Sequence, residues 1–370
     1  YAILFSMLDA KHLLFHHLNA TPNIGGKTLR VLLDHIAGQL FEGDIENLSL
    51  AGIPLSDAKK HTLARAISSF DEDDARESLT KHELDIILLT DETYPDELAE
   101  IPDAPSMLYV RGNADALLVR PRVAIVGTRR PSQYGIDAAR TIAREIAEAG
   151  VCVVSGMALG LDSEAHEGAL EARGSTVAVL GNGLAEQCIA PRSHLALMRR
   201  ITGSGGAVIS ELAPEVSASA GTFPARNRII AGLCQATLVV EAAERSGTLI
   251  TAGFALDQNR DVFAVPGPIF SQLSAGPHTL IREGAAIFTD TQHLLETIRA
   301  SVPSTETDSR AADLSPEEQA VLNALDERPL FRQEILKITN MKADQISVHL
   351  TMLEMNGFIK DIGNGTYRKI

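Results

Sequence analysis

Six short apolar runs mark the middle of the chain, and each is followed by a small-residue turn and a helical pattern. The runs are apolar at nearly every position, which indicates strands that are buried on both faces. They cover residues 123–126, 151–154, 176–180, 207–209, 237–240 and 262–265. Regular strand–helix alternation predicts a doubly wound α/β fold with a parallel sheet, so a ligand is expected at the carboxyl ends of the strands.

The first 80 residues follow a helical period instead. Their apolar residues recur at helical spacing at Leu29, Leu32, Leu33 and Ile36. The preceding turn, residues 21–27, is similar to the glycine turn of helix-hairpin-helix and SAM-like DNA-binding modules, although Asn23 stands where that motif has its first glycine. A plain helix–helix turn is the alternative interpretation. The acidic run over residues 71–74 is interpreted as a solvated linker.

The last 70 residues open with a polar stretch that lacks periodicity. Ser315 and Glu318 then predict a capping box, and Pro316 stands at the first helical position. Helical patterns follow over residues 316–325, 332–338 and 343–356, with Gly357 as a stop and Asn364-Gly365 as a hairpin turn. Three helices and a hairpin predict a winged helix.

These patterns divide the chain into parts. We expect a helical domain over residues 1–80, an α/β domain over residues 81–300, a linker over residues 301–313 and a winged-helix domain over residues 314–370.

The net charge and the positions of the cysteines limit the classes of function that the sequence allows. The net charge of −15 opposes nucleic-acid binding through a broad basic surface, so any attraction has to come from a local cluster. Residues 81–300 hold 17 arginines but only one lysine, which favours planar contacts to phosphate or carboxylate. Cys152, Cys188 and Cys234 are far apart and form no CxxC, which suits a reducing cytoplasm and predicts neither disulfides nor a metal site. No apolar run is long enough for a membrane span.

The turn after the first predicted strand reads Gly127, Thr128, Arg129 and Arg130. It is not the GxGxxG of dinucleotide-binding proteins, because arginines occupy the turn. Backbone N–H groups at the following helix start, together with the two arginines, predict a phosphate site. The alternative is that these arginines pair with surface carboxylates.

The second predicted strand ends at Ser155 and Gly156, and the pattern again indicates an anion-binding turn. Asp162 is expected to cap the helix that carries His166. These two residues and Glu164 could be catalytic, but their spacing on one helical face favours a structural hydrogen bond, and no metal-ligand spacing occurs.

The fifth predicted strand is followed by Ser246, Gly247 and Thr248, which are expected to open a helix at the same edge of the sheet. The helix before that strand begins with a second cationic group at Arg226, Asn227 and Arg228. Three small-residue turns and two arginine pairs then converge on one edge, which strengthens the phosphate-binding interpretation. No nucleophile sits beside a base, and a lone Glu241 lacks a partner for acid–base work.

Over residues 93–296 the chain resembles the DprA/Smf family, the DNA-processing proteins of bacterial natural transformation. The motifs that carry the resemblance are, in order, TYPDEL, APSMLYVRGN, VAIVGTRRPSQYG, VVSGMALGLDSEAHEGAL, FPARNRIIAG, VVEAAERSGTLITAG, FAVPGP and LIREGA. The resemblance implies an extended Rossmann-like domain that binds single-stranded DNA and helps load the RecA recombinase. It also implies a homodimer, no catalytic turnover and no cofactor.

Carried over residue by residue, the family's glycine–hydroxyl–arginine motif falls on Gly127, Thr128 and Arg129. Its arginine-rich helix start falls on Arg226, Asn227 and Arg228. The chain departs from the family at Cys188-Ile189, where a Tyr-Pro pair is usual, and at His278, where an Asn is expected.

Two other functions are left open by the sequence. Rossmann-like nucleotide phosphoribohydrolases use a similar sheet edge, but their PGGxGTxxE loop has a glutamate where Thr251 stands. A protein-interaction scaffold is the other, and it predicts no salt-dependent DNA binding.

Overall fold

The protein is described by a computed structural model that covers residues 8–37, 48–301, 315–325, 330–339, 341, 343–355, 359–361 and 366–369. It divides into two compact units, Tyr1–Val302 and Pro303–Ile370. The predicted linker from residue 302 onward, the Gly357 stop and the Asn364-Gly365 turn lie outside the described residues. The predicted boundaries at residues 80 and 300 stay predictions.

A nine-stranded sheet with the order β1-β2-β6-β5-β4-β3-β7-β8-β9 forms the centre of the first unit. Its strands are β1 (Asp85–Leu88), β2 (Met107–Gly112), β3 (Arg122–Val126), β4 (Cys152–Ser155), β5 (Thr176–Val179), β6 (Ala207–Ser210), β7 (Ala236–Val239), β8 (Asp261–Ala264) and β9 (Ala286–Ile287). The α/β fold and all six predicted strands, β3 to β8, are confirmed.

The sheet is mixed rather than fully parallel. From β6 to β9 every neighbouring pair is parallel, whereas β1 and β2 pair antiparallel with each other and β2 pairs antiparallel with β6. The parallel sheet predicted for β3 to β8 is confirmed, and β1 and β2, for which the sequence predicts no strands, add an antiparallel edge. An antiparallel edge strand on an otherwise parallel sheet is a common arrangement in α/β proteins.

Helices cover both faces of the sheet. They are α5 (Asp96–Ala99), α6 (Gln133–Glu148), α7 (Leu161–Glu171), α8 (Leu195–Gly203), α9 (Thr222–Gly232), α10 (Gly247–Asp257), α11 (Ala275–Arg282) and α12 (Thr291–Ser301). Val123 and Ile125 of β3 pack in a core with α6, α7 and α12, whereas Ala124 and Val126 pack in a second core with α9 and α10. Successive strand residues point to opposite faces, so both faces of β3 are buried, as its continuous apolar run predicts.

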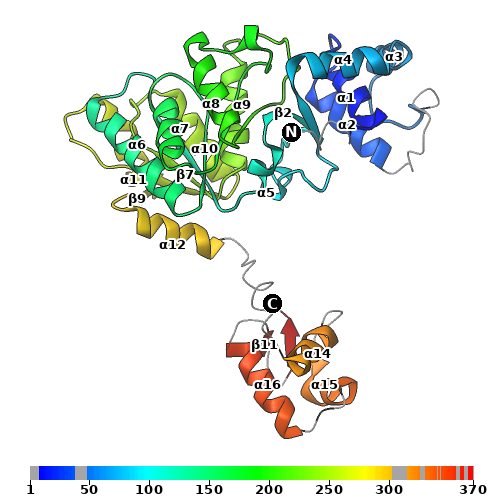
Figure 1. Ribbon diagram of the computed structural model, residues 1–370, viewed down its shortest axis with the longest axis vertical. Coiled ribbons are helices and arrows are strands. Elements are labelled where there is room, and N and C mark those ends of the chain that lie inside the picture. The colour runs from blue at the N-terminus through cyan, green and yellow to red at the C-terminus, as the bar shows by residue number, and fades with distance from the viewer. Residues whose placement is uncertain are drawn as a thin grey trace. The chain divides into compact units, whose positions relative to one another are not determined.

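The amino-terminal helices lie beside β2 at one end of this unit (Figure 1). They are α1 (Ala10–Ala20), α2 (Gly26–Ala37), α3 (Asp57–Ser68) and α4 (Glu72–His82). In the turn between α1 and α2 the left-handed residue is Asn23, at φ 68°, rather than a glycine. The helices share one core with β1, β2, β5, β6 and α8, and the His16 Nδ1 lies 2.9 Å from the Tyr109 hydroxyl of β2.

The interpretation of residues 71–74 as a linker is wrong. Asp71 is the N-cap of α4, and its carboxylate accepts from the backbone N–H groups of Asp73 and Asp74 at 2.9 and 3.1 Å. Acidic side chains satisfy the free N–H groups of a first helical turn and oppose the positive end of its dipole, so the acidic run begins a helix.

The second unit contains α14 (Pro316–Ala324), α15 (Arg332–Thr339), α16 (Ala343–Met355) and a small sheet of β10 (Leu330–Phe331), β12 (Thr366–Lys369) and β11 (Ile359–Asp361). The predicted capping box of Ser315 and Glu318 is present. Three helices and an antiparallel β-pair confirm the winged helix. No described helix is both long and apolar enough to cross a bilayer.

Candidate functional site

A cavity of about 680 Å³ opens at the carboxyl ends of β3 and β7. These neighbouring strands are where the winding of the sheet reverses, because β4, β5 and β6 follow on one side of β3, and β8 and β9 on the other side of β7. A switch point of this kind leaves a crevice in which open α/β sheets bind ligands. The cavity is lined by the turns after β3 and β7, the start of α7 and the first turns of α9 and α10.

Nine of the twelve predicted site residues line this cavity. They are Gly127, Thr128, Arg129, Arg130, Arg226, Asn227, Ser246, Gly247 and Thr248. The structure therefore brings together the turns after β3 and β7 and the arginine-rich start of α9. Their function at the cavity stays a prediction.

The turn after β3 is held by Glu241, the residue that follows the end of β7 by two positions. The Thr128 N–H donates to the Glu241 carbonyl oxygen at 2.8 Å. The Ser132 N–H and hydroxyl donate to the two oxygens of the Glu241 carboxylate at 2.9 and 2.5 Å. Glu241 is buried, so this carboxylate fixes the turn and is not placed as a free acid or base.

Close backbone approach joins the same turn to the start of α7. The Leu161 N–H donates to the Thr128 carbonyl oxygen at 3.2 Å. Gly160 has φ 82°, and a Cβ at this position would lie 2.4 Å from the Thr128 oxygen. Only glycine fits both the backbone angle and the space, so the sequence fixes the turn–helix contact here.

Arg226 is buried beneath the cavity. Its side chain donates to the carbonyl oxygens of Gly156 and Val179 and, at 3.2 Å, to the Asn227 amide oxygen. Burial lowers the pKa of Arg226 to about 10, while Asp162 opposes this shift. Burial raises the pKa of the Asp162 carboxyl, and Arg226 is the strongest group that opposes that rise. Arg226 thus ties the cavity floor to the backbone at Gly156 and Val179, and its charge offsets that of the buried Asp162.

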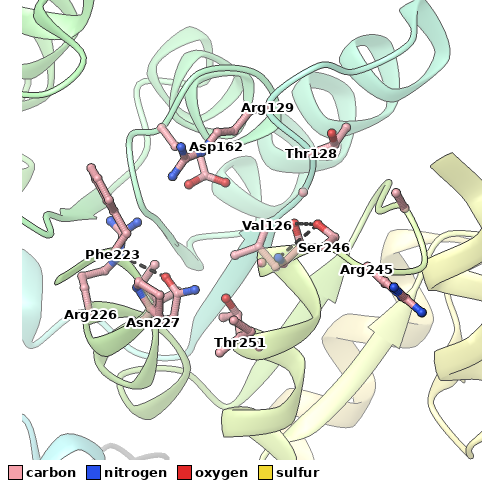
Figure 2. A pocket seen from close by; sticks show the side chains of 18 of the residues that line it. Val126, Thr128, Arg129, Asp162, Phe223, Arg226, Asn227, Arg245, Ser246 and Thr251 are labelled. Atoms are coloured by element: carbon pink, nitrogen blue, oxygen red, sulfur yellow. Dashed lines mark hydrogen bonds between the residues drawn. The ribbon is translucent and has the colours of Figure 1, made fainter. Parts of the chain in front are cut away.

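Three arginines at the cavity are exposed instead: Arg129, Arg130 and Arg245. Within the described ranges, none of them has a carboxylate oxygen within 4 Å. The Arg129 guanidinium lies over the Phe223 ring, 5.1 Å from its centroid, and Figure 2 shows it reaching across the cavity mouth above Asp162. Three cations without a carboxylate partner among the described residues, beside two helix starts, form a site suited to an anionic ligand.

The α10 start takes its expected form. Ser246 is the N-cap of α10, and its hydroxyl oxygen accepts from the Thr248 N–H at 3.2 Å. Gly247 follows as the first helical residue and is exposed. The Leu249 N–H donates to the Ser246 carbonyl oxygen at 3.1 Å, and Gly247, Thr248 and Thr251 line the cavity, so the first turn of α10 borders it.

Three predicted site residues lie away from the cavity lining. The Arg228 guanidinium makes a two-pronged pair with Glu211, at 2.8 and 2.6 Å, and donates to the Asp103 carbonyl oxygen. The buried Ser155 hydroxyl donates to the Ile125 carbonyl oxygen at 2.6 Å. Gly156 lies behind the cavity, where its oxygen accepts from Arg226.

The expected hydrogen bond between Asp162 and His166 is absent from the described contacts. The His166 Nδ1 lies 2.7 Å from the Thr176 hydroxyl oxygen, and that hydroxyl donates to the Val153 carbonyl oxygen. Nδ1 therefore carries the proton. In the described part of the chain, no three potential metal ligands gather at one place.

Sequence reasoning passed over Phe223 and Arg245, which both line the cavity. Phe223 lies inside the motif FPARNRIIAG and Arg245 inside VVEAAERSGTLITAG. Their positions at the starts of α9 and α10, with Phe223 in the first turn of α9 and Arg245 just before the N-cap of α10, are a signal that could have found them.

Comparisons with known proteins agree with this architecture. The family model of DNA recombination-mediator protein A matches residues 85–299, and that of the DprA winged helix domain matches residues 305–365. The chain is 45% identical over 208 residues to Smf of Escherichia coli, which spans 56% of this chain and 55% of that protein. It is 39% identical over 262 residues to DprA of Streptococcus pneumoniae, and that alignment spans 71% of this chain and 88% of the Streptococcus protein.

Two solved structures are similar. That of DprA from Streptococcus pneumoniae has a TM-score of 0.67 at 32% identity and covers 78% of this chain and 98% of that one. A structure of DprA from Helicobacter pylori, described in terms of its single-stranded DNA binding mode, has a TM-score of 0.53 at 29% identity and covers 59% and 97%. On the strength of the family match and of the shared fold, the chain belongs to the DprA/Smf family of DNA-processing proteins.

Proposed function

We propose that this protein binds single-stranded DNA at the switch-point cavity, protects incoming DNA in the cytoplasm and helps load RecA during natural transformation. The observation that carries the proposal is the group of exposed arginines, Arg129, Arg130 and Arg245, without carboxylate partners among the described residues. The planar guanidinium group of arginine can donate two parallel hydrogen bonds to a phosphate, so phosphate is the ligand that suits these arginines best.

The relatives support the nucleic-acid assignment. The Helicobacter pylori protein is described as binding single-stranded DNA, and it shares the fold at 29% identity. The RecA and homodimer parts of the proposal rest on the family resemblance. Binding without catalysis fits a cavity whose lining carboxylate, Asp162, is buried near Arg226, while the neighbouring Glu241 is engaged by Ser132.

The decisive measurement compares matched single- and double-stranded oligonucleotides across a salt series. We expect tighter binding of the single strand with little sequence preference, because a net charge of −15 repels the denser phosphate charge of a duplex. Equal or tighter binding of blunt duplex at moderate salt contradicts the proposal.

Arg129→Ala tests the cavity itself. It should weaken binding of all sequences alike and lower the log–log salt slope by about 0.7, the amount expected for one lost phosphate contact on a single strand. Arg129→Lys should restore only part of the affinity, because an ammonium keeps the charge without the planar fork.

Arg144→Ala is the matched control. Arg144 is an exposed arginine in the later turns of α6, and its nearest carboxylate contact is 3.9 Å long. It should leave affinity and salt slope unchanged. A folded Arg129→Ala protein with wild-type affinity and slope would remove the cavity from the proposal.

Partner and alternative functions need separate assays. Light scattering should give twice the chain mass, and RecA should assemble faster on single strands that carry this protein. A nucleotide assay should release no free base, because Thr251 stands at the position of the hydrolase glutamate.

A further inference from the structure

Two large apolar side chains project from the loop that follows β8. Phe270 is 94% exposed and Ile269 is 78% exposed, the highest values among the large apolar residues that the structure describes. Full burial of such a side chain is worth about 1.5–3 kcal/mol, so a ligand that covers it gains substantially.

The loop that carries these side chains is fixed at its base. The Tyr134 hydroxyl donates to the Pro266 carbonyl oxygen at 3.0 Å, and the His278 Nε2 lies 3.0 Å from the Gly267 oxygen. The Ser271 N–H closes the turn on the Pro268 oxygen at 2.9 Å. A fixed loop presents Phe270 without the entropy loss of ordering a flexible segment on binding.

This loop continues the cavity edge. β7 and β8 are parallel neighbours, so the chain leaves both at the same side of the sheet. The Ala242 N–H donates to the Leu273 oxygen at 2.8 Å, and the Ala242 oxygen accepts from the Gly276 N–H at 2.9 Å. The next residue, Ala243, lines the cavity. Tyr134, half exposed at the loop base, follows the cavity residue Arg130 by four positions.

Charge identifies the ligand that fits here. Arg130 lines the cavity four residues before Tyr134, and Figure 2 shows the Arg245 side chain extending away from the cavity centre. Neither has a carboxylate partner among the described residues. An exposed aromatic side chain on the same sheet edge as guanidinium groups that have no carboxylate partner among the described residues matches a strand that alternates flat bases with phosphates.

We propose that Phe270 stacks on a base of the single-stranded DNA that continues outward from the cavity. This inference rests on the proposed function and extends it: the protein recognises bases, without sequence selection, in addition to phosphates. Stacking on an aromatic ring tolerates every base because each has a flat face.

The chain has no tryptophan, so Phe270→Trp introduces a single reporter into the full-length protein. Addition of single-stranded oligonucleotide should quench its emission, and an oligonucleotide of abasic sites should bind without quenching it. Leu118→Trp is the control, because Leu118 is 45% exposed but precedes β3, at the opposite edge of the sheet. Its emission should not change with either oligonucleotide.

Phe270→Ala gives the energetic test. Affinity for single strands should fall about tenfold, whereas the salt slope should stay at the wild-type value because no phosphate contact is lost. The loss should vanish on abasic oligonucleotide. If Phe270→Ala keeps wild-type affinity and Phe270→Trp is not quenched while Arg129→Ala weakens binding, the inference is overturned and the proposed function stands. If Arg129→Ala and Phe270→Ala both keep wild-type affinity, the proposed function is overturned as well. The emission of Phe270→Trp is also measured without DNA at several protein concentrations. A change with concentration would show that the loop contacts a second copy of the chain, and this too would overturn the inference.

Discussion

Arg226 and Arg129 border one cavity but differ in what surrounds the guanidinium group. Arg226 is 5% exposed and donates to two backbone oxygens, whereas Arg129 is exposed and its guanidinium lies over an aromatic ring. A cation that is already satisfied by protein acceptors positions a site, and an unsatisfied cation binds the ligand. We therefore expect the two substitutions to act through different quantities.

Arg226→Met should lower the free energy of unfolding by roughly 3 kcal/mol, because it leaves two buried backbone oxygens without their donor and removes the cation that offsets the charge of Asp162. Arg130→Met is the matched control, since Arg130 is exposed and its removal should change stability by less than about 0.5 kcal/mol. Urea unfolding followed by circular dichroism measures both. Equal stability of the two variants would show that Arg226 is not what holds the cavity floor.

His166 makes stability depend on pH. Burial lowers its pKa to about 3, with His194 and Arg226 adding to the shift, against an ordinary value of 6.5. Between pH 6.5 and 3 the unfolded chain binds a proton that the native chain does not, so this contribution to stability is complete above pH 6.5 and falls as the pH falls.

His166→Gln should therefore make the loss of stability on acidification shallower by about 1.4 kcal/mol per pH unit below pH 6. Unfolding free energies at pH 7.5, 6.0 and 5.0 give the two slopes. The comparison is of slopes, so a constant loss of stability in the variant does not affect it, and parallel slopes would contradict the prediction.

At the scale of elements, the period of apolar residues predicted the six strands β3 to β8, because strands buried on both faces need continuous apolar runs. It also placed nine site residues at one edge, since all parallel strands end there. It missed β1 and β2, whose strand state depends on antiparallel partners distant in sequence. Nor could spacing show that Arg226 is buried, because its acceptors at residues 156 and 179 come from other elements.

The junction between the β3 turn and α7 depends on one glycine. Gly160→Ala should lower the melting temperature and weaken single-strand binding, because the new Cβ displaces the Thr128 backbone and the residue has a positive φ. Gly253→Ala is the control: this position lies in α10 with no atom within 4 Å of the new Cβ. There the change should stabilise the protein by up to about 1 kcal/mol. Thermal melting that shows the same sign for both would refute the junction argument.

At the scale of the whole molecule, the described cavity residues all belong to the unit Tyr1–Val302. A chain that ends at Val302 should therefore keep single-strand affinity within about tenfold of the full chain. The competing view is a basic wing of Lys360, Arg368 and Lys369 in the second unit. Fluorescence anisotropy titration of single-stranded DNA with both chains at one salt concentration distinguishes the two views. A loss of single-strand affinity of more than roughly a hundredfold in the shortened chain favours the wing.

The core shared by the amino-terminal helices and the sheet cannot be completed until late in synthesis, because its parts lie far apart in the sequence. The Asn19 amide of α1 donates to the Glu211 carbonyl oxygen, 192 residues further along the chain. A ribosome that adds about 5–20 residues per second needs roughly 10–40 s to cover that distance, whereas a helix forms within about 1 μs. Leu13, Leu14 and Leu18, fully buried in the finished protein, are thus made long before the strands that complete their core. For that interval the side of this helical core that packs on β5, β6 and α8 in the finished protein stays uncovered, and an exposed apolar surface of this kind is what a nascent-chain chaperone binds.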